Sequence, residues 1–358
     1  MSATVRVELG ARSYDVRIGA FSPEEVAAAI AAALDPATTG VAVLVDGGVS
    51  AVSPRVAPLV GALARRLPRV ERLDLQVGEA AKTLAEIERT TEWLAAQGFD
   101  RKAALVGIGG GAATDHAGFS AAIYLRGIPF ALVPTTLLAM VDASVGGKTG
   151  VDLRAGKNLV GAFHQPRAVV ADLGFLDTLP ARERTAGLAE VIKCGFIADP
   201  GLLDLLERSA GPPGTDLVLE LIARAVRVKA EVVASDEHEG GRRAILNFGH
   251  TVGHALEAES GYDLLHGEAV ALGMVAALRL GATLGFGSEA LVDRAKALLA
   301  RVGLPTDFGA RMTEGVIRRL SVDKKRRGSA IRFVFCPAPG ETRLVDVTPA
   351  DIATHLGA

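Results

Sequence analysis

The sequence contains few cysteines and no excess of basic residues, and each shortage excludes a class of protein. The two cysteines, Cys194 and Cys336, are too far apart in the sequence for a disulfide framework or a thiolate metal site. The formal net charge is −2, whereas a general nucleic-acid or anionic-membrane binder would carry a basic excess. No apolar run reaches the ~18 residues that span a bilayer, and the N-terminus lacks an apolar signal core. We therefore expect a cytoplasmic protein that binds neither nucleic acid nor membrane.

Alternating strand and helix signals in the first half of the chain predict a parallel sheet. Apolar runs at residues 41–45 and 103–108 are typical of buried parallel strands, and helical patterns separate them. Ser22 and Pro23 stand where an N-cap and a first helical turn favour them, just before a helix at residues 24–34. Units that alternate in this way predict a sheet covered by helices.

The second half of the chain is dominated by helical patterns. At 358 residues the chain exceeds what one hydrophobic core usually supports, so two domains are expected. A break near Pro180 separates the two halves. We predict a Rossmann-like α/β domain over residues 1–176 and a mainly helical domain over residues 177–358. The predicted helices of the second half are residues 182–197, 201–209, 216–234, 245–260, 268–284 and 288–302, followed by a hairpin at 331–336 and 341–345.

Three of the seven histidines, His250, His254 and His266, fall within 17 residues. The first two are four residues apart, so on a helix they share one face, and neutral imidazole is a good zinc ligand. Glu190 and Lys193 are normally read as a surface ion pair, but a carboxylate among apolar neighbours also suits a metal ligand. From spacing alone, the candidate metal ligands are therefore His250, His254 and Glu190, and the role of His266 is undecided. A histidine pair on a helix is often only structural, and a metalloprotease is disfavoured because no glutamate directly follows His250.

Two glycine-rich segments are candidates for anion binding. Residues 107–111, Gly-Ile-Gly-Gly-Gly, follow a predicted strand and precede a helix, a context that favours a nucleotide phosphate, although a tight turn without a ligand is the alternative. Residues 146–149, Gly-Gly-Lys-Thr, are not a phosphate-binding P-loop because Asp142 occupies the position of its first glycine. Lys148 and Lys157 could instead hold a phosphate or carboxylate, or could be solvated surface lysines.

Taken together and in this order, the motifs resemble those of the 3-dehydroquinate synthases, a family of sugar phosphate cyclases. The resemblance is dense over residues 105–270. It implies an N-terminal NAD-binding α/β domain, a helical C-terminal domain and an active site in the cleft between them. The matching segments are residues 109–115, 124–127, 134–138, 141–150, 156–158, 162–166, 189–193, 246–254 and 266–268.

The resemblance also implies roles for particular residues. One divalent ion, zinc or cobalt, would be held by Glu190, His250 and His266, which replaces the set chosen from spacing and turns His254 toward the substrate. Residues on the NAD side would be Asp46, Lys82, Gly109, Gly110, Gly111, Asp115, Thr135, Thr136, Asp142, Lys148 and Lys157. Substrate would be bound by Arg126, Asp142, Lys148, Asn158, Lys193, Lys229, Arg243, His254 and Lys324. Catalytic residues would be Lys148, Lys193, Arg243, Asn247, His254 and Glu239.

The implied reaction converts 3-deoxy-D-arabino-heptulosonate 7-phosphate to 3-dehydroquinate and phosphate in the shikimate pathway. It proceeds by transient oxidation with NAD, phosphate elimination, reduction and an intramolecular aldol closure. The expected binding partner is a small phosphorylated keto acid, and the expected oligomeric state is a homodimer. The alternatives are another sugar phosphate cyclase, a metal-dependent polyol dehydrogenase with NAD, and a catalytically silent binding protein. His116 is unusual in its loop, and its role is left open.

Overall fold

A seven-stranded sheet forms the core of the N-terminal part of the chain. The computed structural model describes residues 1–153, 156–209, 214–261, 263–320, 326–327 and 330–357. Strand order is β1-β2-β9-β6-β5-β3-β4, and every neighbouring pair is parallel except β1 with β2. The predicted parallel sheet is thus confirmed. The strands are β1 (Ser2–Val7), β2 (Tyr14–Gly19), β3 (Val41–Asp46), β4 (Val70–Leu75), β5 (Ala104–Gly109), β6 (Phe130–Pro134) and β9 (Ala168–Asp172).

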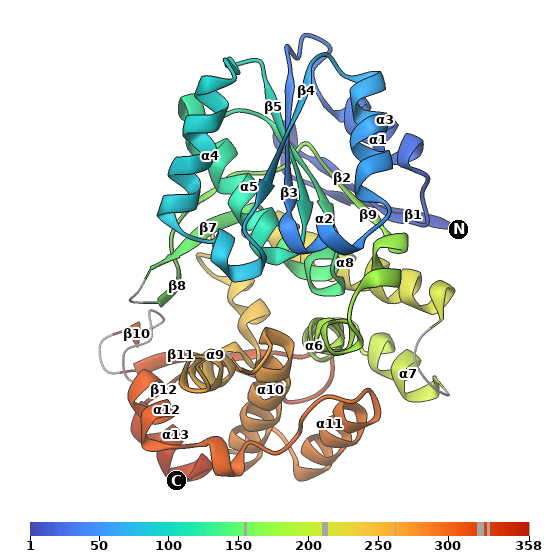
Figure 1. Cartoon of the computed structure of the whole chain (residues 1–358). Coiled ribbons are helices and arrows are strands. Elements are labelled where there is room, and N and C mark those ends of the chain that lie inside the picture. Colours follow the sequence, from blue (N-terminus) through green and yellow to red (C-terminus); the bar gives the residue numbers. More distant parts are fainter. Residues whose placement is uncertain (154–155, 210–213, 262, 321–325, 328–329, 358) are drawn as a thin grey trace. The chain divides into compact units, whose positions relative to one another are not determined.

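Helices cover the sheet on both sides, with α1 and α3 on one side and α4 and α5 on the other (Figure 1). The predicted cap of α1 is confirmed, because the Ser22 hydroxyl accepts from the Glu25 amide while the Glu25 side chain accepts from the Ser22 amide. An antiparallel hairpin of β7 (Lys148–Leu153) and β8 (Gly156–Phe163) packs beside α5. The helices are α1 (Pro23–Ala33), α2 (Gly47–Val52), α3 (Val56–Arg66), α4 (Leu84–Ala96), α5 (Gly111–Ile123) and α8 (Thr215–Ser235).

The C-terminal part is mainly helical, as predicted. Helix α10 is buried almost all round because α6, α9, α11 and α13 each contact it, which explains its apolar sequence. The predicted hairpin is confirmed as β11 (Ala330–Phe335) paired with β12 (Arg343–Val347), with the short β10 (Arg326–Arg327) alongside. The helices are α6 (Ala181–Ile197), α7 (Gly201–Arg208), α9 (His250–Glu259), α10 (His266–Thr283), α11 (Glu289–Arg301), α12 (Glu314–Leu320) and α13 (Pro349–Leu356).

Short helical segments connect these elements, and one of them corrects a prediction. The helix expected at residues 245–260 begins only at His250. The preceding 3-10 turn ends at Asn247, and Gly249, the N-cap of α9, adopts φ +78, which interrupts a continuous helix. Among the described helices, none is long and apolar enough to cross a membrane. The remaining segments are η1 (Gly10–Arg12), η2 (Gly78–Ala81), η3 (Tyr124–Arg126), the π-helical η4 (Ala139–Ala143), η5 (Leu173–Thr178), η6 (Arg242–Asn247) and η7 (Gly309–Arg311).

The chain divides by its internal contacts into two units. The first unit comprises Met1–Pro180 and Thr215–Ala234, and the second comprises Ala181–Gly214 and Ser235–Ala358. Helix α8 therefore belongs to the first unit although its sequence lies within the helical half. A single boundary between residues 176 and 177 does not describe this division, because sequence order alone does not report which core a helix packs against.

Glycines allow α9 and α10 to approach closely, and this contact yields a prediction. A Cβ atom at Gly273 would lie 1.9 Å from the carbonyl oxygen of Gly249, an atom of the backbone that cannot move aside cheaply. We expect Gly273→Ala to lower the free energy of unfolding by roughly 3 kcal/mol, the upper end of overpacking costs. Thermal or urea denaturation measures this change. The exposed Gly214 has open space around it, so Gly214→Ala should leave stability within about 0.5 kcal/mol. Equal stability of the two variants would contradict the packing argument.

Candidate functional site

Side chains that can bind a metal ion gather in the second unit. Glu190 lies within α6, whereas His250 and His266 are the first residues of α9 and α10. One carboxylate oxygen of Glu190, Oε1, lies 3.5 Å from Nε2 of His250 and 3.6 Å from Nε2 of His266. An oxygen and two ring nitrogens that converge in this way form a donor set suited to zinc or a similar divalent ion.

The other ring nitrogen of each of these two histidines faces an acceptor. Nδ1 of His250 lies 3.1 Å from the carbonyl oxygen of Phe248, and Nδ1 of His266 lies 3.3 Å from Oε2 of Glu257. An acceptor at Nδ1 favours the tautomer that carries its proton there, which leaves the lone pair at Nε2, the atom nearest Glu190. The residues present therefore fit a divalent ion, and the fit favours the set of Glu190, His250 and His266.

His254 offers an alternative ligand at the same place. The ring centroid of His254 lies 5.2 Å from that of His250 and 5.7 Å from that of His266. Ligand atoms of these three histidines all lie within 4.8 Å of one another, so they too could hold a metal ion. His254 is exposed, however, while Glu190 is 1% exposed, and a deeply buried carboxylate gains more from a nearby cation. The choice of Glu190 over His254 stays a prediction that this geometry favours.

Buried carboxylates give this site a negative electrostatic potential, which attracts cations. Lys193, one turn after Glu190, forms an ion pair with its Oε2, and both side chains are buried. The surface ion pair that the spacing allowed is thus excluded. Burial lowers the pKa of His266, but hydrogen bonds with Glu190 and Glu257 outweigh it and raise that pKa to about 9. At neutral pH the ring therefore carries a proton on Nε2 as well as on Nδ1, and a divalent cation would take the place of the Nε2 proton.

The segment before α9 collects three of the predicted catalytic residues. The Asp236 carboxylate accepts hydrogen bonds from the amides of Arg243, Gly241 and Gly240, which lower its pKa and fold the loop tightly. The Arg243 side chain is 1% exposed and donates to the carbonyl oxygen of Glu237. Further along, Nδ2 of Asn247 donates to Oε1 of Glu239 at 2.7 Å. The structure therefore brings Glu239, Arg243 and Asn247 into one ordered loop next to His250.

In the first unit, several predicted NAD-side residues lie at the carboxyl ends of neighbouring parallel strands. Asp46 ends β3, Gly109 ends β5, and Thr135 and Thr136 follow β6. On one side β3 pairs with β4, the next strand of the chain, and on its other side it pairs with β5. The direction in which successive strands are added therefore reverses between β3 and β5. Such a switch point is where open α/β sheets bind nucleotides.

Close packing explains the glycines at this switch point. A Cβ atom at Gly109 would lie 2.5 Å from Cβ of Ala113 and 2.8 Å from Cβ of Asp46. Helix α5 begins at the next residues with Gly110 as its N-cap and no side-chain cap, so its first amides remain available to an anion. Asp46 itself accepts from the amides of Gly48 and Gly78, which ties two loops of this edge together.

A buried charge cluster joins the start of α5 to the β7–β8 hairpin. Nζ of Lys82 donates to Oδ2 of Asp115 at 2.8 Å and to Oδ1 of Asn158 at 2.7 Å. Asp152 accepts from the amide of Asn158, whose φ of 53 is unusual for a residue other than glycine. Burial lowers the pKa of Lys82, but the carboxylates of Asp115 and its acidic neighbours outweigh burial and raise it. The structure thus unites Lys82, Asp115 and Asn158, which the sequence separates.

A second buried lysine of the first unit is held by the π-helical turn. Nζ of Lys229, on α8, donates to Oδ1 of Asp142 at 2.5 Å and to its carbonyl oxygen at 2.6 Å. Asp142 lies within the turn Ala139–Ala143, and π-turns often occur at functional sites. Near the hairpin, Nζ of Lys157 lies 3.6 Å from Oε1 of Glu79.

Two other predicted residues, Arg126 and Lys148, are exposed, and a third lies outside the described residues. Arg126 is exposed and follows the last turn of α5, which is roughly 20 Å long, so it lies at the opposite edge of the sheet from Gly109. Lys148 is exposed at the first residue of β7. Lys324 lies outside the described residues. The substrate-binding roles of these three residues stay predictions.

The open question about His116 has a structural answer. Its Nε2 lies 2.8 Å from Oγ1 of Thr90, its Nδ1 lies 2.7 Å from the carbonyl oxygen of Ala81, and it is fully buried. Burial lowers the pKa of His116, so the ring is neutral at physiological pH. His116 therefore links α5 to α4 and to η2 and has a structural role.

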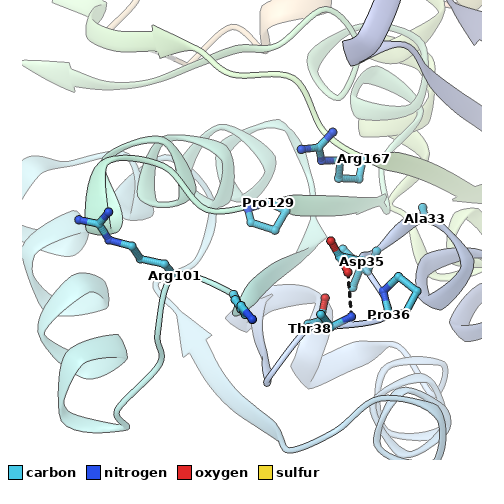
Figure 2. Close-up of a pocket in the computed structure, with 10 residues that line it drawn as sticks. Ala33, Asp35, Pro36, Thr38, Arg101, Pro129 and Arg167 are labelled. Carbon is cyan, nitrogen blue, oxygen red and sulfur yellow. Dashed lines mark hydrogen bonds between the residues drawn. The ribbon is translucent and has the colours of Figure 1, made fainter.

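A cavity of about 490 Å³ lies at the amino ends of the parallel strands of the first unit (Figure 2). Thr38, Lys102, Pro129 and Arg167 line it, and each precedes a strand of the sheet. None of the predicted site residues that the structure describes lines this cavity. It is therefore separate from the carboxyl edge at which the predicted NAD-side residues collect.

Sequence reasoning missed Glu257 and Asp152. Glu257 stands seven residues after His250 and shares its helix face, but its partner His266 lies on another helix. Asp152 accepts from the Asn158 amide, while its own amide donates to the Lys82 carbonyl oxygen. The helical spacing of Glu257 is a signal that could have found it, whereas the sequence holds no comparable signal for Asp152.

Two sequence models of one enzyme family match most of the chain. The model described as 3-dehydroquinate synthase N-terminal matches residues 72–186, and the model described as 3-dehydroquinate synthase C-terminal matches residues 187–326. The 3-dehydroquinate synthase of Rhodospirillum rubrum is 45% identical over 356 residues, which cover 96% of this chain and 91% of that protein.

Two solved structures share the fold over nearly the whole chain. A 2-deoxy-scyllo-inosose synthase complexed with carbaglucose-6-phosphate, NAD+ and Co2+ is 26% identical, with a TM-score of 0.87 and coverage of 99% of each chain. A 2-epi-5-epi-valiolone synthase from Streptomyces hygroscopicus with NAD+ and Zn2+ bound is 29% identical, with a TM-score of 0.83. The match covers 98% of this chain and 96% of that one.

Proposed function

The chain belongs to the 3-dehydroquinate synthase family, and we propose that its 3-dehydroquinate synthase activity depends on the clusters of the two units described above. The enzyme is a lyase that converts 3-deoxy-D-arabino-heptulosonate 7-phosphate to 3-dehydroquinate and phosphate. The observation that carries the proposal is the convergence of Glu190 Oε1 with Nε2 of His250 and of His266. That donor set suits a divalent ion, and related cyclases contain NAD+ together with Co2+ or Zn2+.

Glu190, His250 and His266 would hold the divalent ion, Zn2+ or Co2+. When bound, such an ion makes a coordinated hydroxyl more acidic and so assists loss of a hydride from its carbon. Two neutral imidazoles and one carboxylate leave the site with net positive charge once the ion is present, which matches an anionic substrate. Lys193 keeps the second oxygen of Glu190 occupied, so that a single oxygen faces the two ring nitrogens.

The carboxyl edge of the sheet in the first unit would hold NAD+. When bound, this cofactor would supply a hydride acceptor that is regenerated in each turnover, so none would be consumed in the net reaction. The uncapped start of α5 offers amides to the pyrophosphate, and Gly109 lets the backbone pass close by. Lys82 and Asn158 keep the Asp115 carboxylate oriented beside that helix start.

The substrate carries a carboxylate and a phosphate, so its binding site needs several cationic side chains. Arg243 and Lys193 are buried, already oriented by neighbouring acceptors, and suited to bind these groups with charge-assisted hydrogen bonds. Lys229, held by Asp142, is a third cation of this kind. His254 is exposed, so a ring nitrogen can take a proton from a substrate hydroxyl and pass it to solvent.

A single assay tests the proposal. The purified protein is given the seven-carbon keto acid phosphate with a trace of NAD+ and with Zn2+ or Co2+, and phosphate release is followed. Steady phosphate release without net accumulation of NADH is the expected result, since the cofactor is regenerated in each turnover. Build-up of NADH would indicate a polyol dehydrogenase instead. Turnover of sedoheptulose 7-phosphate in place of the keto acid would indicate another sugar phosphate cyclase.

A further inference from the structure

We propose that Glu257 is a positioning residue that orients the ring of His266 for metal binding. The inference rests on the metal site of the proposed function and adds a residue to it. Glu257 is 4% exposed, and its Oε2 lies 3.3 Å from Nδ1 of His266. A carboxylate buried this deeply is costly unless a donor or a cation faces it, and the imidazole supplies that partner.

The position of Glu257 on its helix explains how it reaches His266. Glu257 stands seven residues, about two turns, after His250, so both side chains lie on one face of α9. His266 begins α10, which packs closely against α9 through glycines such as Gly273. One face of α9 therefore supplies a metal ligand, His250, and the group that holds a second ligand on the neighbouring helix.

The His266 ring lies between two carboxylates, one at each nitrogen. Oε2 of Glu257 faces Nδ1 at 3.3 Å, and Oε1 of Glu190 lies 3.6 Å from Nε2. An acceptor at Nδ1 keeps a proton on that atom, so Nε2 is the ring nitrogen that can bind an ion beside Glu190. Partners of this kind behind a ligating histidine typically contribute a factor of ~10–100 to metal affinity.

His250 provides an internal comparison. Its Nδ1 faces the carbonyl oxygen of Phe248, a backbone atom that no side-chain substitution removes. The orientation of His266, in contrast, depends on a side chain. Replacing Glu257 is therefore expected to weaken metal binding without removing any ligand.

The test measures the dissociation constant for Zn2+ by competition with a chromogenic chelator, starting from metal-free protein. Glu257→Ala should bind Zn2+ about 10–100-fold more weakly than the wild type. Glu257→Gln keeps an oxygen that can accept from Nδ1 and should recover most of the affinity. Glu259→Gln is the matched control, because Glu259 is an exposed residue of the same helix that pairs with Arg319 at 2.8 Å. Its affinity should equal that of the wild type.

Cobalt provides a second measurement that a general loss of stability would not change. At saturating Co2+, the visible absorption bands of Glu257→Ala should shift because the His266 ring reorients, while those of Glu257→Gln should resemble the wild type. If the alanine variant does not fold, Glu257→Asp replaces it, since its shorter side chain leaves the carboxylate out of reach of Nδ1.

Two results would overturn the inference in distinguishable ways. Wild-type affinity and wild-type cobalt bands in Glu257→Ala would show that Glu257 does not orient the ring, while the metal site itself stands. If instead the wild-type protein bound Zn2+ no better than His250→Ala, the metal site of the proposed function would fail together with this inference.

Discussion

The His250→Ala variant is expected to lose its metal ion and about a thousandfold in kcat/KM for the keto acid phosphate. His250 supplies one of the two ring nitrogens near Glu190 Oε1, and its ring is held by the Phe248 carbonyl oxygen. Polarisation of an oxygen by a divalent ion contributes several kcal/mol to a transition state, and about 4 kcal/mol corresponds to a factor of a thousand. Metal analysis of the purified variant and steady-state phosphate release measure the two effects.

His355→Ala is the control for this experiment. His355 is an exposed histidine on α13, so its replacement removes an imidazole without touching the cluster. Metal content and kcat/KM should stay at the wild-type level. A His250→Ala protein that retains one tightly bound ion and full activity would remove His250 from the ligand set and leave His254 as the histidine to examine.

The Lys82→Met variant is expected to lose roughly 3 kcal/mol of folding stability and about tenfold in NAD+ affinity. Lys82 is 5% exposed and donates to both Asp115 and Asn158, so methionine leaves a partly buried carboxylate without its cation. Asp115 would also lose its fixed orientation beside the start of α5. Denaturant unfolding measures the first effect and titration calorimetry with NAD+ the second. Lys102→Met, an exposed lysine of the same unit, should change neither quantity appreciably.

The pH dependence of this stability loss follows from the raised pKa of Lys82. A lysine whose pKa is higher in the folded state than in the unfolded state binds its proton more tightly when folded. Its contribution is therefore fully present below the unfolded value of roughly 10.4 and is lost as pH rises through the higher folded value. The stability difference between wild type and Lys82→Met should be constant near neutral pH and shrink only in alkaline solution. A difference that grew with pH in alkaline solution would contradict the ion pair.

Features that depend on local order along the chain can be predicted from the sequence. Parallel strands buried on both faces must be apolar, so the runs at residues 41–45 and 103–108 identify β3 and β5. The cap at Ser22 is predictable because its partner Glu25 lies only three residues away. Family motifs are also arranged in order along the chain, which is why the sequence alone suffices to infer the enzyme family and its activity.

Features that depend on packing between distant segments cannot be predicted from residue patterns alone. Spacing favours His254 over His266, because two residues four apart on one helix are neighbours in any fold. The choice of Glu190 and His266 depends on how α10 packs against both α6 and α9 through Gly267 and Gly273. The start of α9 at His250 and not at residue 245 follows from the positive φ of Gly249, which helical periodicity does not report.

The sequence by itself therefore determined the α/β and helical classes of the two halves and the enzyme family, and it supplied the predicted site residues. Only the tertiary structure decided the partners of those residues: Glu257 behind His266, Asp115 and Asn158 around Lys82, and Asp142 at Lys229. The physical reason is that periodicity and capping act over a few residues, whereas a buried charge is stabilised by whichever groups the folded chain brings within hydrogen-bonding distance.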